Sequence, residues 1–180
     1  MLNFLRLHKA YGALLHRCGI LAGIMTFAMM LLVVINVALR YTLNISVPGT
    51  LEITESLLTV LIFLSLALTQ YEGGHIQVVL FTNRFPPSVR HSVRCIAMLL
   101  GLLFFTWCSW GAWGEAVKSF AINEQEWGSV RFPLYPVKFI VFAGLLMLAF
   151  QFAFDAVAAA LGVDPHADED VVQTTLEEAL

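Results

Sequence analysis

Hydrophobic residues along the chain are grouped into long segments that contain no Asp, Glu, Lys or Arg. Four such segments occur, at residues 18–39, 56–71, 95–114 and 139–154. A helix needs about 20 residues to cross a hydrocarbon core about 30 Å thick, with a usual range of about 17–25. The first and third segments meet this length directly. The second and fourth meet it if their helices begin about a turn earlier, so the pattern predicts four transmembrane helices.

These segments divide the chain into three parts. A four-helix membrane domain covers residues 18–158, and an acidic tail of residues 159–180 follows it. Within the domain, we expect spans at residues 18–40, 51–71, 92–114 and 136–156. The predicted fold class is therefore an all-α integral membrane protein.

Residues 1–17, which precede the first span, show a helical pattern. At 100° per residue, one face is apolar and the opposite face is basic. The apolar face holds Phe4, Leu7, Tyr11, Leu14 and Leu15, and the basic face holds Arg6, Lys9, His16 and Arg17. Such a segment is typical of an amphipathic helix that lies in the membrane interface. The alternative is a helix that docks on the rest of the protein.

Composition supports a membrane protein. Hydrophobic residues make up 59% of the chain and charged residues 13%, whereas a soluble domain has about 45–50% and about 25%. A soluble enzyme and a disordered chain are therefore disfavoured. The net charge of -3 provides no basic surface for nucleic acid. The three cysteines lack CxxC spacing, so neither a disulfide framework nor a zinc site is expected.

The distribution of Lys and Arg predicts the orientation in the membrane. With the N-terminus inside, the cytoplasmic segments hold six of these residues and the outer loops hold four. This bias follows the positive-inside rule. Because four spans return the chain to the starting side, both termini are expected in the cytoplasm.

Charged side chains are absent from the middle of every predicted span. A carrier of charged solutes usually has intramembrane charges, so a self-contained carrier is disfavoured. The polar residues that we single out there are expected to join helices rather than bind a solute: Asn36, Ser65, Thr69, Thr106 and Ser109. Small residues that permit close helix contacts are Gly19, Gly23, Gly101, Gly111, Gly114 and Gly144.

All five histidines lie outside the four apolar segments. A transmembrane cytochrome needs histidine ligands that face each other inside the membrane. A membrane anchor of a redox complex, which binds haem or quinone, is therefore kept only as the alternative function. We expect no cofactor, no metal and no catalytic residue.

Charge collects at the outer ends of the first two spans. Arg40 ends the first span, and Glu52 and Glu55 share one helix face at the start of the second. The loop between them contains Pro48-Gly49, a turn signal. Two interpretations stay open: an ion pair that pins the two helix ends, or a docking surface for a partner outside the membrane.

A second candidate interface lies on the predicted cytoplasmic side. His75 follows a Gly-Gly pair at the end of the second span, and Arg90 and Arg94 precede the third. These three residues are expected to contribute to contacts at the inner membrane surface.

Several motifs resemble one known family. The segments are residues 34–41 (VINVALRY), 47–55 (VPGTLEITE), 74–78 (GHIQV) and 133–138 (PLYPVK). Their order and placement on four spans resemble the small membrane subunit of tripartite ATP-independent periplasmic (TRAP) transporters. The resemblance covers roughly residues 20–155. One departure is that two apolar residues follow the GHIQV stretch, where the family often has an acid.

The resemblance implies a protein of the bacterial or archaeal inner membrane. Its partners are then a large multi-helix membrane subunit and a periplasmic substrate-binding protein, with lipid around them. Such a complex takes up organic acids or related solutes, driven by an ion gradient. The small subunit is expected to be a scaffold that carries no transport site and helps the binding protein to dock. The transported solute and the coupling ion stay open.

Overall fold

Four α-helices dominate the computed structural model, which describes residues 2–72, 87–128 and 130–160, with side chains for 10–72, 92–93, 95–128 and 130–159. The helices are α1 (Leu2–Leu43), α2 (Thr50–Tyr71), α4 (Pro87–Ala121) and α5 (Tyr135–Ala160). Each contains an apolar segment long enough to cross a membrane: Ala10–Leu43, Thr50–Tyr71, Cys95–Ala121 and Tyr135–Ala159. The prediction of four helices able to span a membrane is confirmed.

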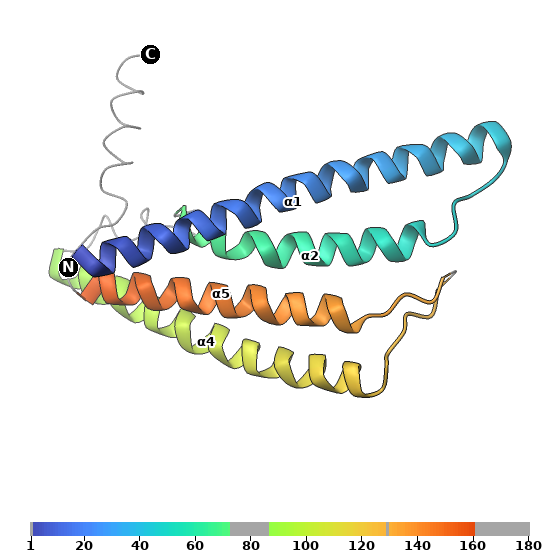
Figure 1. Cartoon of the computed structure of the whole chain (residues 1–180). Coiled ribbons are helices and arrows are strands. Elements are labelled where there is room, and N and C mark those ends of the chain that lie inside the picture. Colours follow the sequence, from blue (N-terminus) through green and yellow to red (C-terminus); the bar gives the residue numbers. More distant parts are fainter. Residues whose placement is uncertain (1, 73–86, 129, 161–180) are drawn as a thin grey trace, which may run out of the picture.

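The four helices form an open row in the order α1, α2, α5, α4 (Figure 1). The extensive contacts join α1 to α2, α2 to α5, and α5 to α4. Only 6% of the apolar window is buried in α1 and in α4, against 22% in α2 and 28% in α5. The two inner helices therefore provide the core, and the two outer helices present broad apolar surfaces.

The row has two ends, which we name by their content. The terminal end is where α1 and α4 begin and α2 and α5 end. The loop end holds the α1–α2 connection, residues 44–49, and the α4–α5 connection, residues 122–134. In Figure 1 the helices lie close together at the terminal end, and α1 diverges from α2 toward the loop end.

Helix α1 is longer than predicted. It runs through 42 residues without a break, which corresponds to about 63 Å at about 1.5 Å per residue. No proline interrupts it, so residues 2–17 continue the span and do not form a separate element. Leu15 is fully buried beside Ala67 and Leu148. Residues 10–17 thus dock on α2 and α5, while their predicted placement along the membrane surface stays a prediction.

Glycine permits close helix contacts at several positions. A Cβ atom on Gly144 would collide with the backbone of Phe63, and one on Gly101 would collide with the ring of Phe152. Gly19 lies in the same way against Leu68. Gly23, Gly111 and Gly114 have nothing within 4 Å of an added Cβ among the described residues, so a close contact of these three glycines with another subunit stays a prediction. Small size thus matters where α5 meets its neighbours and where α1 meets α2.

The intramembrane polar residues behave differently from the prediction. Ser65 and Thr69 donate to carbonyl oxygens of α2 itself, at 3.0 Å in each case. Asn36 uses its side-chain oxygen to accept a hydrogen bond from the backbone N–H of Val47, at 2.8 Å. It therefore holds the α1–α2 loop against α1. Polar contacts between helices come instead from Gln70, which donates to Asp155 at 2.7 Å, and from the hydroxyl of Tyr11, which donates to the carbonyl of Met147 at 2.5 Å.

Candidate functional site at the loop end

The start of α2 is shaped by a tight turn. Gly49 has φ 82, a left-handed conformation that favours glycine. The hydroxyl of Thr50 donates to the carbonyl of Val47 at 2.8 Å, and the N–H of Ile53 donates to the carbonyl of Gly49 at 3.0 Å. Glu52 then falls in the first helical turn, where the helix dipole favours an acid.

The α4–α5 connection forms a short hairpin. Asn123, two residues beyond the end of α4, has φ 48, in the left-handed region. Beyond it, the N–H of Glu126 donates to the carbonyl of Phe132 at 2.9 Å, and the N–H of Leu134 donates to the carbonyl of Glu124 at 3.1 Å. These two hydrogen bonds fix the direction in which the acidic side chains of the hairpin leave the backbone.

This hairpin packs over the start of α2. A Cβ atom built on Gly49 would lie 3.0 Å from Val130, and one built on Gly128 would collide with the carboxylate of Glu52. Glu52 is consequently only 4% exposed. The loop end is thus closed over α2 by a segment that lies far away in the sequence.

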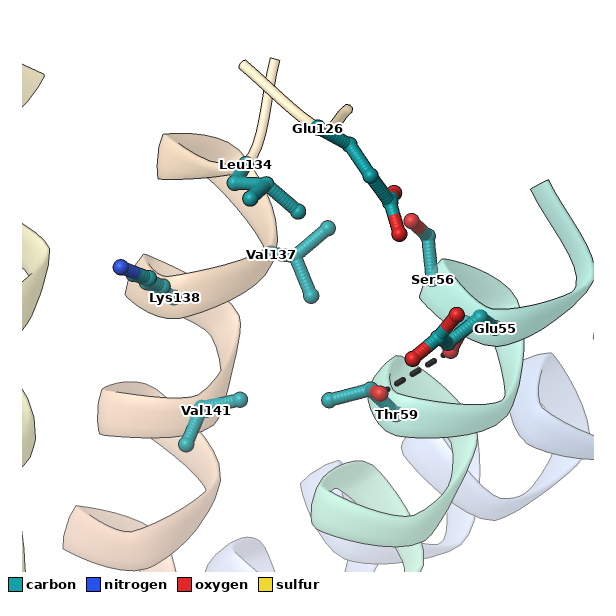
Figure 2. Close-up of a pocket in the computed structure, with 8 residues that line it drawn as sticks. All are labelled: Glu55, Ser56, Thr59, Glu126, Leu134, Val137, Lys138 and Val141. Carbon is teal, nitrogen blue, oxygen red and sulfur yellow. Dashed lines mark hydrogen bonds between the residues drawn. The ribbon is translucent and has the colours of Figure 1, made fainter. Parts of the chain in front are cut away.

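A cavity of about 200 Å³ lies beneath the hairpin, between α2 and α5. Figure 2 shows the carboxylate of Glu126 pointing from the hairpin toward Ser56 of α2, with Glu55 next to it. Its lining residues are Glu55, Ser56, Thr59, Glu126, Leu134, Val137, Lys138 and Val141. The cavity is therefore acidic where Glu55 of α2 and Glu126 of the hairpin line it, whereas α5 contributes two valines and Lys138.

The cavity concentrates negative charge. Burial, and then repulsion from Glu55 and Glu52, raises the pKa of Glu126 above its ordinary value. One carboxylate oxygen of Glu126 is buried and has no hydrogen-bond partner among the described residues. This arrangement favours a cationic or hydrogen-donating group near Glu126.

The basic residue that lines the cavity, Lys138, is engaged by another acid. Lys138 contacts Glu124 at 2.5 Å, and this hydrogen bond lowers the pKa of Glu124. In Figure 2 the Lys138 side chain extends away from α2. Two acids of one hairpin thus have opposite environments, because Glu124 faces a lysine and Glu126 faces other acids.

The structure assembles this site differently from the sequence interpretation. Glu52 and Glu55 lie at the expected end of α2, but Arg40 is exposed near the end of α1. The ion pairs found among the described residues, His16–Glu72 and Lys138–Glu124, do not include Arg40. No ion pair between Arg40 and these acids is found among the described residues, and both interpretations of the charged helix ends stay open to the mutational test given below.

Glu126 is the residue that the sequence reading missed. It lies between the third and fourth predicted spans, but the row order that places α5 beside α2 has no signature in the sequence.

The predicted cytoplasmic interface cannot be compared in the same way. His75 lies outside the described residues, and so do the side chains of Arg90 and Arg94, whose backbones belong to α4. A role of these three basic residues at a cytoplasmic interface therefore stays a prediction. A separate finding concerns metals: among the described residues, no group of three or more His, Cys, Asp or Glu could hold a metal ion.

The site lies within the part of the chain that matches a known family. The chain matches the profile of a family described as "Tripartite ATP-independent periplasmic transporters, DctQ component" over residues 29–162. The match begins within α1, at residue 29. It includes all of α2, α4 and α5, and with them the residues that line the acidic cavity. No curated protein matches the chain.

Proposed function

We propose, from the premise that the chain belongs to the DctQ family of tripartite ATP-independent periplasmic transporters, that it acts as the scaffold subunit of such a transporter. It is a small, multi-pass membrane component, and its family consists of transporter components rather than enzymes. We further propose that the assembled complex takes up organic acids or related solutes with an ion gradient. The alternative of a redox-complex anchor receives no support from the family match.

The open row of helices is the observation that carries the scaffold proposal. Only 6% of the apolar window of α1 and of α4 is buried. A row of this kind presents long helix faces to a large multi-helix subunit and to lipid. Its apolar segments 18–39, 56–71, 95–114 and 139–154 contain no charged residue that could serve as a transport site.

The orientation proposal puts the loop end in the periplasm and both termini in the cytoplasm. The support is the excess of Lys and Arg in the segments that then face the cytoplasm. With this orientation, the acidic cavity under the hairpin opens toward the compartment of the substrate-binding protein.

The docking proposal follows from the charge of that cavity. Glu55 and Glu126 lie together, and a carboxylate oxygen of Glu126 has no hydrogen-bond partner among the described residues. A lysine or arginine on the binding protein would complement both acids. Charge complementarity of this kind acts mainly on the encounter rate and on register.

Charge reversal tests the docking proposal. We expect Glu55→Lys and Glu126→Lys to slow uptake about 10-fold or more at low ionic strength, with a smaller effect at high salt because salt screens exposed charges. The matched control is Glu115→Lys, an exposed position on α4 away from the cavity. The measurement is uptake by the reconstituted complex, with assembly checked by co-purification of the large subunit.

A further variant separates docking from pinning of the helix ends. Because Arg40 is not in the ion pairs found here, adding Arg40→Glu to Glu55→Lys should not restore uptake. Restoration by this double reversal, or wild-type uptake in both single variants, would contradict the docking proposal.

A further inference from the structure

The hairpin at residues 122–134 extends across to α2 and covers the first turns of that helix. A Cβ atom on Gly128 would collide with the carboxylate of Glu52, and one on Gly49 would lie 3.0 Å from Val130. Two backbone hydrogen bonds within the hairpin keep its shape. The hairpin is therefore a small ordered unit, and its contact with α2 closes the acidic cavity at the loop end.

Acidic side chains meet where the hairpin contacts α2. In Figure 2 the carboxylate of Glu126 points toward Ser56 and lies beside Glu55, and Glu52 adds to the repulsion of its negative charge. One oxygen of Glu126 is buried and has no hydrogen-bond partner among the described residues. An ionised Glu126 thus places a buried acceptor next to two other acids, which disfavours the closed hairpin.

The basic residues near the hairpin do not offset these acids. Lys138 of α5 lines the cavity but is bound to Glu124. Arg131, in the hairpin itself, is exposed and takes part in none of the ion pairs found among the described residues. The charged groups that face Glu126 from the two helices packed against it are therefore the two acids of α2 and a lysine that is already paired.

A proton on Glu126 relieves the unfavourable contact. A protonated carboxyl group carries no charge, so the acids of α2 no longer repel it, and its O–H becomes a hydrogen-bond donor. The pKa of Glu126 agrees with this preference, because burial and then the two acids of α2 raise it above its ordinary value. The closed hairpin thus favours the protonated form, and the open hairpin favours the ionised form.

We propose that the hairpin is a pH-sensitive lid over the acidic cavity, closed when Glu126 is protonated and open more often when Glu126 is ionised. The sign follows from linkage: opening lets the carboxylate ionise in water, so opening becomes more favourable as the pH rises. The consequence for transport rests on the docking proposal, since a closed lid withholds the charge of Glu126 from a basic group on the binding protein. Docking should then weaken as the pH falls.

A distance between two spin labels on the purified full chain in mild detergent tests the lid. The labels are placed on Leu51→Cys of α2 and Trp127→Cys of the hairpin, in a chain whose three native cysteines are replaced by serine. Both positions are exposed and neither lines the cavity. A reference pair, Leu51→Cys with Phe120→Cys at the end of α4, reports on the helices alone and should not respond to pH.

The population with the longer label distance should grow about three-fold or more between pH 5 and pH 7.5, because each unit of raised pKa corresponds to a tenfold change in the equilibrium. Glu124, whose pKa is lowered, stays ionised across this range. Glu126→Gln should keep the short distance at both pH values, and Glu115→Gln, at an exposed position on α4, should behave as wild type. A distance that does not change with pH in the wild type, or the same change in Glu126→Gln, would overturn the lid.

Binding of the periplasmic binding protein to the reconstituted complex separates the lid from the docking proposal. Wild-type binding should weaken more between pH 7.5 and pH 5 than binding by Glu126→Gln, which has no proton to gain at this position. Equal binding by the two at pH 7.5 would reject Glu126 as a docking acid and leave the label distances as support for the lid. Weaker binding by Glu126→Gln at pH 7.5 with the same pH dependence as wild type would reject the regulation and leave docking intact.

Discussion

Two glutamates of one hairpin show how position decides the behaviour of a single residue type. Glu124 and Glu126 are separated by one residue and leave the backbone next to the same hairpin hydrogen bonds. Lys138 lowers the pKa of Glu124, whereas burial and the neighbouring acids raise that of Glu126. Neither direction follows from the sequence, because Lys138 and Glu55 belong to other helices.

The opposite shifts predict opposite effects of pH and of neutralisation. Glu124 stabilises the fold above its ordinary pKa of 4.5, and this contribution is lost as the pH falls through its lowered value. Glu126 binds its proton more tightly in the folded chain, so its ionisation destabilises the fold as the pH rises through its raised value. At pH 7, Glu126→Gln should raise the melting temperature and Glu124→Gln should lower it.

Melting curves of both variants and the wild type between pH 7 and pH 4 check these signs. The difference between Glu126→Gln and wild type should shrink as the pH falls from 7 toward the raised pKa. If both variants shift the melting temperature in the same direction at pH 7, the two glutamates do not have the opposite environments described here.

At the scale of elements, the start of α1 is the point at which the sequence interpretation and the structure differ most. The pattern of residues 1–17 predicts an amphipathic segment, and two residues of its apolar face, Tyr11 and Leu15, dock α1 on α2 and α5. Leu15 is fully buried, whereas its neighbour Leu14 is 49% exposed. Periodicity finds the apolar face, but it cannot distinguish lipid from protein as the surface that covers it.

This pair of leucines provides a matched test of docking. Leu15→Ala should lower the free energy of unfolding by about 2–5 kcal/mol, because it leaves a cavity in the core. Leu14→Ala should change it by less than about 0.5 kcal/mol, as for a surface substitution. Denaturation in detergent micelles measures both values. Equal losses would mean that residues 10–17 do not dock as described.

The contact between α2 and α5 depends on a glycine. A Cβ on Gly144 meets the backbone of Phe63, which cannot rotate away as a flexible side chain can. Gly144→Ala should therefore force α5 away from α2 and cost about 1–3 kcal/mol. Gly111→Ala on α4 is the control, since nothing lies within 4 Å of its added Cβ, and it should cost nothing. A neutral Gly144→Ala, measured by thermal unfolding, would reject the close contact.

At the scale of the whole molecule, the sequence predicts the number and extent of the spans better than their arrangement. Long charge-free segments identify all four helices, because a hydrocarbon core imposes a minimum length. The order of the helices in the row cannot be predicted in this way, because a helix that is apolar on all sides carries no sequence signal for its neighbour. The cavity depends on that order, and for this reason Glu52 and Glu55 were predicted while Glu126 was not.

The central claim is that this chain is a scaffold that works only within a complex. Its apolar outer helices and the four apolar segments that lack charged residues both support the proposal that a partner carries the transport site. Solute uptake into proteoliposomes tests this directly, with the chain, the large membrane subunit and the periplasmic binding protein added alone and together. The account predicts ion-gradient-driven uptake only when all three are present. Uptake by this chain alone, or undiminished uptake when it is omitted, would contradict the account.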